Sequence, residues 1–138
     1  MQRIIRGLGE IALRVNDLES MQAFYSDVVG LALMKRFPHA AFFRIADGFE
    51  GHTQILALFD RSAEPEYEGP DPRRTTVDHI AFTISLGNYA AEKTRLERAG
   101  RSVRTAVHAW VQWRSLYVDD PEGNTVELVC YDPSISKT

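Results

Sequence analysis

Apolar and polar residues alternate in two short segments, one near the start of the chain and one in its middle. In residues 10–15 and 79–84, every second residue is large and apolar, which is typical of a strand buried on one face. The two segments begin 69 positions apart, at Glu10 and His79, and read Glu-Ile-Ala-Leu-Arg-Val and His-Ile-Ala-Phe-Thr-Ile. The chain therefore contains an internal repeat.

A helical pattern follows each of these segments. The spacing predicts one helix over Leu18 to Val29, with Asp17 as its N-cap, and a second over Asn88 to Ala99 that ends at Gly100. The first helix has apolar residues at positions three and four apart, so one of its faces can pack on a sheet.

Three short β-like segments follow each helix, so each half is predicted as a βαβββ unit. They are Ala32 to Arg36, Ala41 to Ala46 and Thr53 to Phe59 in the first half, and Ser102 to Thr105, Gln112 to Val118 and Thr125 to Tyr131 in the second. We divide the single domain into a first module at residues 1–62, a proline-containing linker at 63–76 and a second module at 77–138.

Strand alternation places three potential metal ligands on one side of the sheets. The apolar residues of each opening strand point toward the helices, so Glu10 and His79 point away from them. Aligning the last strands of the two halves at an offset of 72 sets Ile55 against Glu127, and alternation puts Glu127 on the same side as His79. A hairpin closing about Glu122 would also place a tyrosine, Tyr117, opposite Glu127.

Composition and charge exclude several classes of protein. The chain has 138 residues, of which 44% are hydrophobic and 25% charged, as in an ordinary globular domain. A net charge of −3 without a basic cluster argues against a nucleic-acid partner, and the single Cys130 excludes an internal disulfide. Charges interrupt every apolar stretch near the N-terminus, so we expect no signal peptide, no membrane partner and a cytoplasmic location.

Taken together, the motifs resemble the vicinal oxygen chelate superfamily, which includes glyoxalase I, bleomycin-resistance proteins, fosfomycin-resistance enzymes and extradiol dioxygenases. The resemblance covers nearly the whole chain and rests on the two opening strands, Asp17-Leu18, Phe24-Tyr25, Gly30-Leu31, residues 78–82 and residues 120–128. It implies an α+β fold of two tandem βαβββ modules whose curved mixed sheets form a metal cleft. It also implies a small-molecule substrate and a homodimer.

The resemblance assigns metal ligands to Glu10, His79 and Glu127. The family's fourth ligand position falls on Ile55, which has no donor atom, and the neighbouring Gln54 lies on the wrong face unless a bulge intervenes. The implied cofactor is a divalent metal ion, iron(II) for a dioxygenase, or nickel, zinc, cobalt or manganese for a lyase or isomerase.

A narrower resemblance is to the extradiol dioxygenase fingerprint, in which a histidine precedes a tyrosine, a Pro-x-Gly turn and the carboxylate ligand. It implies catalytic roles for His108 as an acid/base and for Tyr117 as a group that orients the substrate. Those dioxygenases have histidine where this chain has Glu10. Two carboxylates and one histidine make a harder ligand set, so the ligands and the fingerprint favour different chemistries.

Each candidate ligand also has a purely structural interpretation. Glu10 could pair with Arg14, Arg44 or Arg114, His79 could be a buried neutral histidine, and Glu127 could be a surface carboxylate. An unpaired charge is costly between Val126 and Leu128, so we favour the ligand role for Glu127 and, with it, for His79.

The other aromatic and histidine residues are also open to two interpretations. His108 has a counterpart 69 positions earlier, His39. This relationship suggests that the two histidines could be equivalent loop residues of the repeat, as an alternative to a catalytic role for His108. Four aromatic residues could line a substrate pocket, but aromatic residues in strands are more often core, and we favour core for Phe42, Phe43, Trp110 and Trp113.

The sequence thus favours a metal-dependent enzyme that binds vicinal oxygens of a small substrate, with an extradiol-type dioxygenase as the first candidate. A glyoxalase-like isomerase or lyase, or an epimerase, is the alternative, and a non-catalytic protein of the bleomycin-resistance type is a third. The family pairs modules within one chain or across a dimer, and the sequence does not choose between these arrangements.

Overall fold

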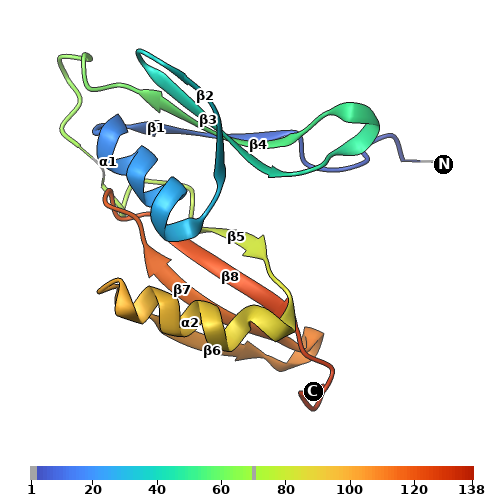
Figure 1. Cartoon of the computed structure of the whole chain (residues 1–138). Coiled ribbons are helices and arrows are strands. Elements are labelled where there is room, and N and C mark those ends of the chain that lie inside the picture. The colour runs from blue at the N-terminus through green and yellow to red at the C-terminus, as the bar shows by residue number, and fades with distance from the viewer. Residues whose placement is uncertain (1–2, 70) are drawn as a thin grey trace. The chain divides into compact units, whose positions relative to one another are not determined.

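Figure 1 shows a computed structural model of the chain, which describes residues 3–69 and 71–138. The chain divides into two compact units, Met1–Pro70 and Asp71–Thr138. Each unit contains a four-stranded mixed sheet, with strand orders β1-β4-β3-β2 and β5-β8-β7-β6. The α+β class and the two βαβββ modules are as the sequence predicts.

The first module follows the predicted order of elements, with a change inside its helix. Its strands are β1 (Glu10–Val15), β2 (Ala32–Phe37), β3 (Ala40–Ala46) and β4 (Gln54–Asp60). The predicted helix is a short α1 (Leu18–Ala23) that continues as a π-helical segment, η1 (Phe24–Val29). Asp17 caps α1 by accepting a hydrogen bond from the backbone N–H of Ser20 at 3.1 Å, as predicted.

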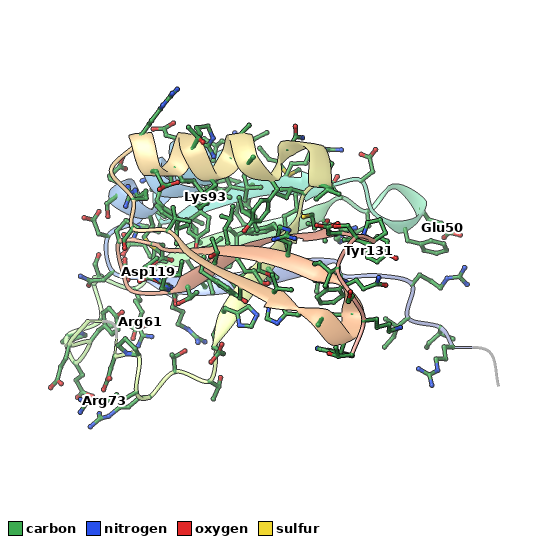
Figure 2. All side chains as sticks on the ribbon, turned by 90° about the horizontal axis from the view of Figure 1, so that it is seen from below. Glu50, Arg61, Arg73, Lys93, Asp119 and Tyr131 are labelled. Atoms are coloured by element: carbon green, nitrogen blue, oxygen red, sulfur yellow. The ribbon has the colours of Figure 1, made fainter. Side chains whose placement is uncertain are left out.

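The second module repeats this order. It contains β5 (His79–Thr83), α2 (Tyr89–Arg98), β6 (Arg104–His108), β7 (Trp113–Asp119) and β8 (Thr125–Tyr131). Gly100 follows α2 with a φ of +80°, a left-handed conformation that favours glycine at a helix end. Figure 2 shows Asp119 and Tyr131 at opposite ends of this sheet, where β7 and β8 end.

The strand register corrects the alignment of the two modules. Ala12 of β1 lies opposite Ala57, and the equivalent Ala81 of β5 lies opposite Glu127. The counterpart of Glu127 is therefore Ala57, and the predicted match with Ile55 is wrong. A shift of two residues leaves every side chain on the same face, so the pattern of apolar residues cannot detect it.

Alternation along β5 separates a core face from a site face. Ile80 and Phe82 are buried, whereas His79, Ala81 and Thr83 are exposed. Each module has its own apolar core on the helix side of its sheet. Buried core residues include Met21, Phe24, Leu56 and Leu58 in the first module and Leu96, Leu116, Val126 and Leu128 in the second.

The aromatic residues follow the predicted core placement only in part. Phe43 is fully buried, and Phe42 packs edge-on between the rings of Phe37 and Phe59. Trp110 is 65% exposed and Trp113 is 44% exposed, so the core prediction is wrong for both. Trp110 lies in the turn between β6 and β7, and Trp113 is the first residue of β7, so both are at the end of the sheet.

No described helix is long and apolar enough to cross a membrane.

Candidate functional site

The turn between β7 and β8 fixes which residues face each other in the site. The carboxylate of Asp120 accepts hydrogen bonds from the backbone N–H groups of Glu122 at 2.9 Å and Asn124 at 3.0 Å. Gly123 has a φ of +84°, which the tight turn requires. The turn sets Tyr117 opposite Glu127, and the predicted hairpin register is confirmed along its length.

Glu127 is a buried carboxylate at the centre of the site. It is 5% exposed, and a buried charge is costly unless hydrogen bonds or opposite charges compensate it. Its Oε2 atom accepts hydrogen bonds from the hydroxyls of Ser115 at 2.5 Å and Tyr117 at 3.3 Å. Its other oxygen, Oε1, lies 3.1 Å from Nε2 of His79.

His79 lies between two carboxylates. Its Nδ1 atom is 2.7 Å from Oδ1 of Asp78 and its Nε2 atom faces Glu127. When Nδ1 donates its proton to Asp78, the lone pair of Nε2 points at Oε1 of Glu127. Two electron-pair donors at this distance repel each other, so a proton or a cation must lie between them.

The chemistry and spacing of this pair fit two ligands of one divalent metal ion. Ligand atoms about 2.1 Å from a metal and at right angles to each other are about 3 Å apart, close to the observed separation. The contact from Asp78 to Nδ1 is the outer support that metal-binding histidines usually have. Among the described residues, no three His, Cys, Asp or Glu side chains come together as a complete metal site, and the third predicted ligand belongs to the other unit.

The third predicted ligand, Glu10, lies in the other unit. It is the first residue of β1, is exposed, and lies opposite Ile55 in the register with β4. Two of the arginines considered as its partners pair elsewhere, Arg44 with Asp47 and Arg114 with Asp132. Gln54, the weaker candidate for a fourth ligand, donates its side-chain amide to the carbonyl of Asp47.

Tyr117 packs edge-on against the ring of His79, with 6.3 Å between the ring centroids, and His108 contacts Tyr117 in turn. Nε2 of His108 lies 3.0 Å from the hydroxyl of Tyr117 and 3.9 Å from Oε2 of Glu127. Burial raises the pKa of Tyr117, and the charge of Glu127 adds to this, so the phenol stays protonated and donates to Glu127. Nε2–H of His108 can then donate to the Tyr117 oxygen, which links the three side chains in one chain.

The repeat counterpart of His108 takes no part in such a chain. The side chain of His39 is 82% exposed and lies 3.8 Å from the carboxylate of Asp60. The ring of His108, in contrast, contacts Tyr117. The two histidines are therefore not equivalent in their surroundings.

Two residues of the site were missed in the sequence. Ser115 lies two positions before Tyr117 and so shares its face of β7, a relationship that strand alternation could have shown. Asp78 directly precedes His79, and no pattern in the sequence indicates that its side chain turns back to the histidine ring.

Known proteins resemble this chain along most of its length. The model of the Glyoxalase/Bleomycin resistance protein/Dioxygenase superfamily matches residues 7–128. The chain is 25% identical to glutathione transferase FosA of Serratia marcescens, over 91% of this chain and 81% of that protein. It is 31% identical to biphenyl-2,3-diol 1,2-dioxygenase 3 of Rhodococcus globerulus, over 88% of this chain but only 61% of the dioxygenase.

A solved structure gives the same result for the fold. The crystal structure of lactoylglutathione lyase from Agrobacterium tumefaciens matches with a TM-score of 0.66 and 30% identity, over 93% of this chain and 96% of the lyase. The family match covers far more than half of the chain. This chain therefore belongs to the glyoxalase/bleomycin resistance protein/dioxygenase superfamily.

Proposed function

We propose that this protein is a metal-dependent enzyme that binds two neighbouring oxygen atoms of a small substrate, with an extradiol-type dioxygenase reaction as the first candidate. The observation that carries the proposal is the continuous contact from His108 through Tyr117 to Glu127, whose other oxygen meets His79. This contact joins the two fingerprint residues, His108 and Tyr117, to the carboxylate of Glu127. The imidazole of His79 then completes a pair of groups suited to binding a metal ion.

Glu10, His79 and Glu127 would hold the metal ion, which would be iron(II) in a dioxygenase. When bound, such an ion acts as a Lewis acid on the two substrate oxygens and stabilises negative charge on them. Asp78 would fix the orientation of His79 through Nδ1, so that Nε2 stays directed at the metal position. The burial of Glu127 would keep water away from the carboxylate that offsets the charge of the ion.

His108 would move protons to and from the substrate. Its ring is partly exposed, in contrast to the buried Glu127, so a substrate hydroxyl can reach it. Because Nε2 contacts the hydroxyl of Tyr117, the proton would pass between His108 and the substrate through that hydroxyl, which would turn from Glu127 toward the substrate oxygens when substrate binds. Tyr117 would also hold the ring of His108 in place and orient the substrate.

A second candidate is a non-oxidative reaction, in which nickel, zinc, cobalt or manganese supports an isomerase, lyase or epimerase. One feature favours it: Glu10 makes the proposed ligand set two carboxylates and one histidine, which is harder than the two-histidine set of non-heme iron oxygenases.

Metal content per chain is the test. The protein would be expressed in iron-supplemented cells, purified without chelator or metal-binding tag, and measured by elemental analysis beside His79→Ala and the control His39→Ala. We expect near-stoichiometric metal in the wild type and in His39→Ala, and its loss in His79→Ala. Iron together with oxygen uptake on a catechol would support ring cleavage, whereas another metal with turnover of a dicarbonyl or an epimerisable acid would support the second candidate.

An absence of metal in the wild type, even after anaerobic reconstitution, would contradict the proposal. It would leave His79 and Glu127 as a structural ion pair and favour a non-catalytic binding protein of the bleomycin-resistance type.

A further inference from the structure

We infer that Ser115 is a positioning residue that determines which oxygen of Glu127 is available to a metal ion. The inference rests on the proposed function, because it concerns the same carboxylate. Ser115 would hold Oε2 so that Glu127 presents only Oε1, on the side of His79.

The hydroxyl of Ser115 is held rigidly by its surroundings. Ser115 is fully buried and lies on β7, an inner strand of its sheet, between Ala106 of β6 and Val129 of β8. The hydroxyl of Tyr89, on α2, also donates to the backbone carbonyl of Ser115 at 2.9 Å. Because the backbone is fixed on both sides, Oγ has little freedom to leave the Glu127 carboxylate.

The two oxygens of Glu127 have different surroundings as a result. Oε2 accepts hydrogen bonds from Ser115 at 2.5 Å and Tyr117 at 3.3 Å, whereas Oε1 faces Nε2 of His79 at 3.1 Å. An oxygen that already accepts two hydrogen bonds is a poor additional metal ligand, since its lone pairs are engaged. Glu127 would therefore bind a metal through one oxygen.

Binding through one oxygen matters for a substrate that must supply two. A carboxylate that binds through both oxygens occupies one more position around the metal, and fewer positions then remain for the substrate. Without Ser115, only the longer contacts from Tyr117 and His108 would restrain Oε2, and the carboxylate could turn to bind through both oxygens. Ser115 would thus keep coordination positions open without touching the metal or the substrate.

The experiment compares Co²⁺ binding by the wild type, Ser115→Ala, Ser115→Thr and the control Ser102→Ala, an exposed serine outside the strands. Co²⁺ serves as the probe because its visible absorption reports coordination number, and its affinity is measured by competition with a chelator. Ser115→Ala should weaken the absorption bands, as expected for a higher coordination number, and change Co²⁺ affinity about 10-fold or more. Ser115→Thr keeps the hydroxyl and should restore the spectrum of the wild type, and Ser102→Ala should match it.

Thermal unfolding of the metal-free proteins separates this role from a purely structural one, since a loss of stability alone would leave the Co²⁺ spectrum of the folded protein unchanged. If the threonine methyl group prevents folding, Tyr117→Phe replaces that variant, and it should shift the spectrum less than Ser115→Ala because its contact is longer. A wild-type spectrum and affinity in folded Ser115→Ala would overturn this inference and leave the proposed function standing. Failure of the wild type to bind Co²⁺ would overturn both.

Discussion

The hydroxyl oxygen of Tyr117 lies 3.0 Å from Nε2 of His108. The two residues are nine positions apart in sequence and lie on adjacent antiparallel strands, β7 and β6. The hydroxyl also donates to Glu127, so it links His108 to the carboxylate, and a change at Tyr117 should affect proton transfer. The fold should be almost unaffected, because Glu127 keeps its hydrogen bond from Ser115.

Removing this hydroxyl should therefore lower turnover with little loss of stability. In Tyr117→Phe, Glu127 keeps its shorter hydrogen bond from Ser115, so we expect the free energy of unfolding to change by about 1 kcal/mol or less. The rate constant kcat should fall by about 100-fold, in the usual range for a group that supports acid/base catalysis. Steady-state kinetics on metal-loaded protein measures the fall, and an unchanged kcat would remove Tyr117 from the mechanism.

Replacing Glu10 tests the third proposed ligand and the arrangement of the modules. Glu10→Gln should weaken metal binding by about 10-fold or more, because a neutral amide oxygen replaces a charged carboxylate oxygen. Isothermal titration with Mn²⁺ would measure the change, and wild-type affinity would exclude Glu10 as a ligand.

Mixing two defective variants then shows whether one chain or two form the site. When refolded together, Glu10→Gln and His79→Ala chains regain an intact ligand set only if Glu10 of one copy meets His79 of another. Recovery of tight metal binding in the mixture would indicate a site shared across a dimer, and no recovery would indicate a site within each chain.

The turn at Asp120 should contribute strongly to stability. Its buried carboxylate accepts backbone and side-chain hydrogen bonds from Asn124 and a backbone hydrogen bond from Glu122. Asp120→Ala should lower the free energy of unfolding by about 2–3 kcal/mol, because it leaves these donors unpaired. Asp120→Asn keeps one accepting oxygen and should cost about 1 kcal/mol. Urea unfolding would measure both, and equal losses would show that the acceptor atom is not the cause.

Acid should weaken the attachment of the C-terminal segment. Hydrogen bonds from Ser134 lower the pKa of Asp132, and the Arg114 guanidinium lowers it further. A lowered pKa in the folded state means that the stabilisation is present above the ordinary carboxyl pKa of about 4 and is lost as pH falls below it. The Tm difference between the wild type and Asp132→Asn should therefore be larger at pH 6 than at pH 3. A difference independent of pH would show that the charge of Asp132 is not responsible.

Local patterns in the sequence were enough to predict the order of the strands and helices and the face that His79 and Glu127 share, although β6 begins and ends later than predicted. The two-residue period of β5 and β8 placed His79 and Glu127 on the face away from the helix, and the turn at Asp120 set the hairpin register. These features depend on residues close in sequence, so their patterns can be read directly. The family resemblance added the roles of His108 and Tyr117, which remain predictions.

Other features depended on the tertiary structure. The register between β1 and β4, which makes Ala57 the counterpart of Glu127, follows from pairing between strands far apart in sequence, and a shift of two residues leaves the apolar pattern unchanged. The contact of Ser115 with Oε2 of Glu127 depends on side-chain positions across two strands. Thus the sequence by itself determined which residues share a face, because the strand period is local, and the tertiary structure determined which of their atoms meet.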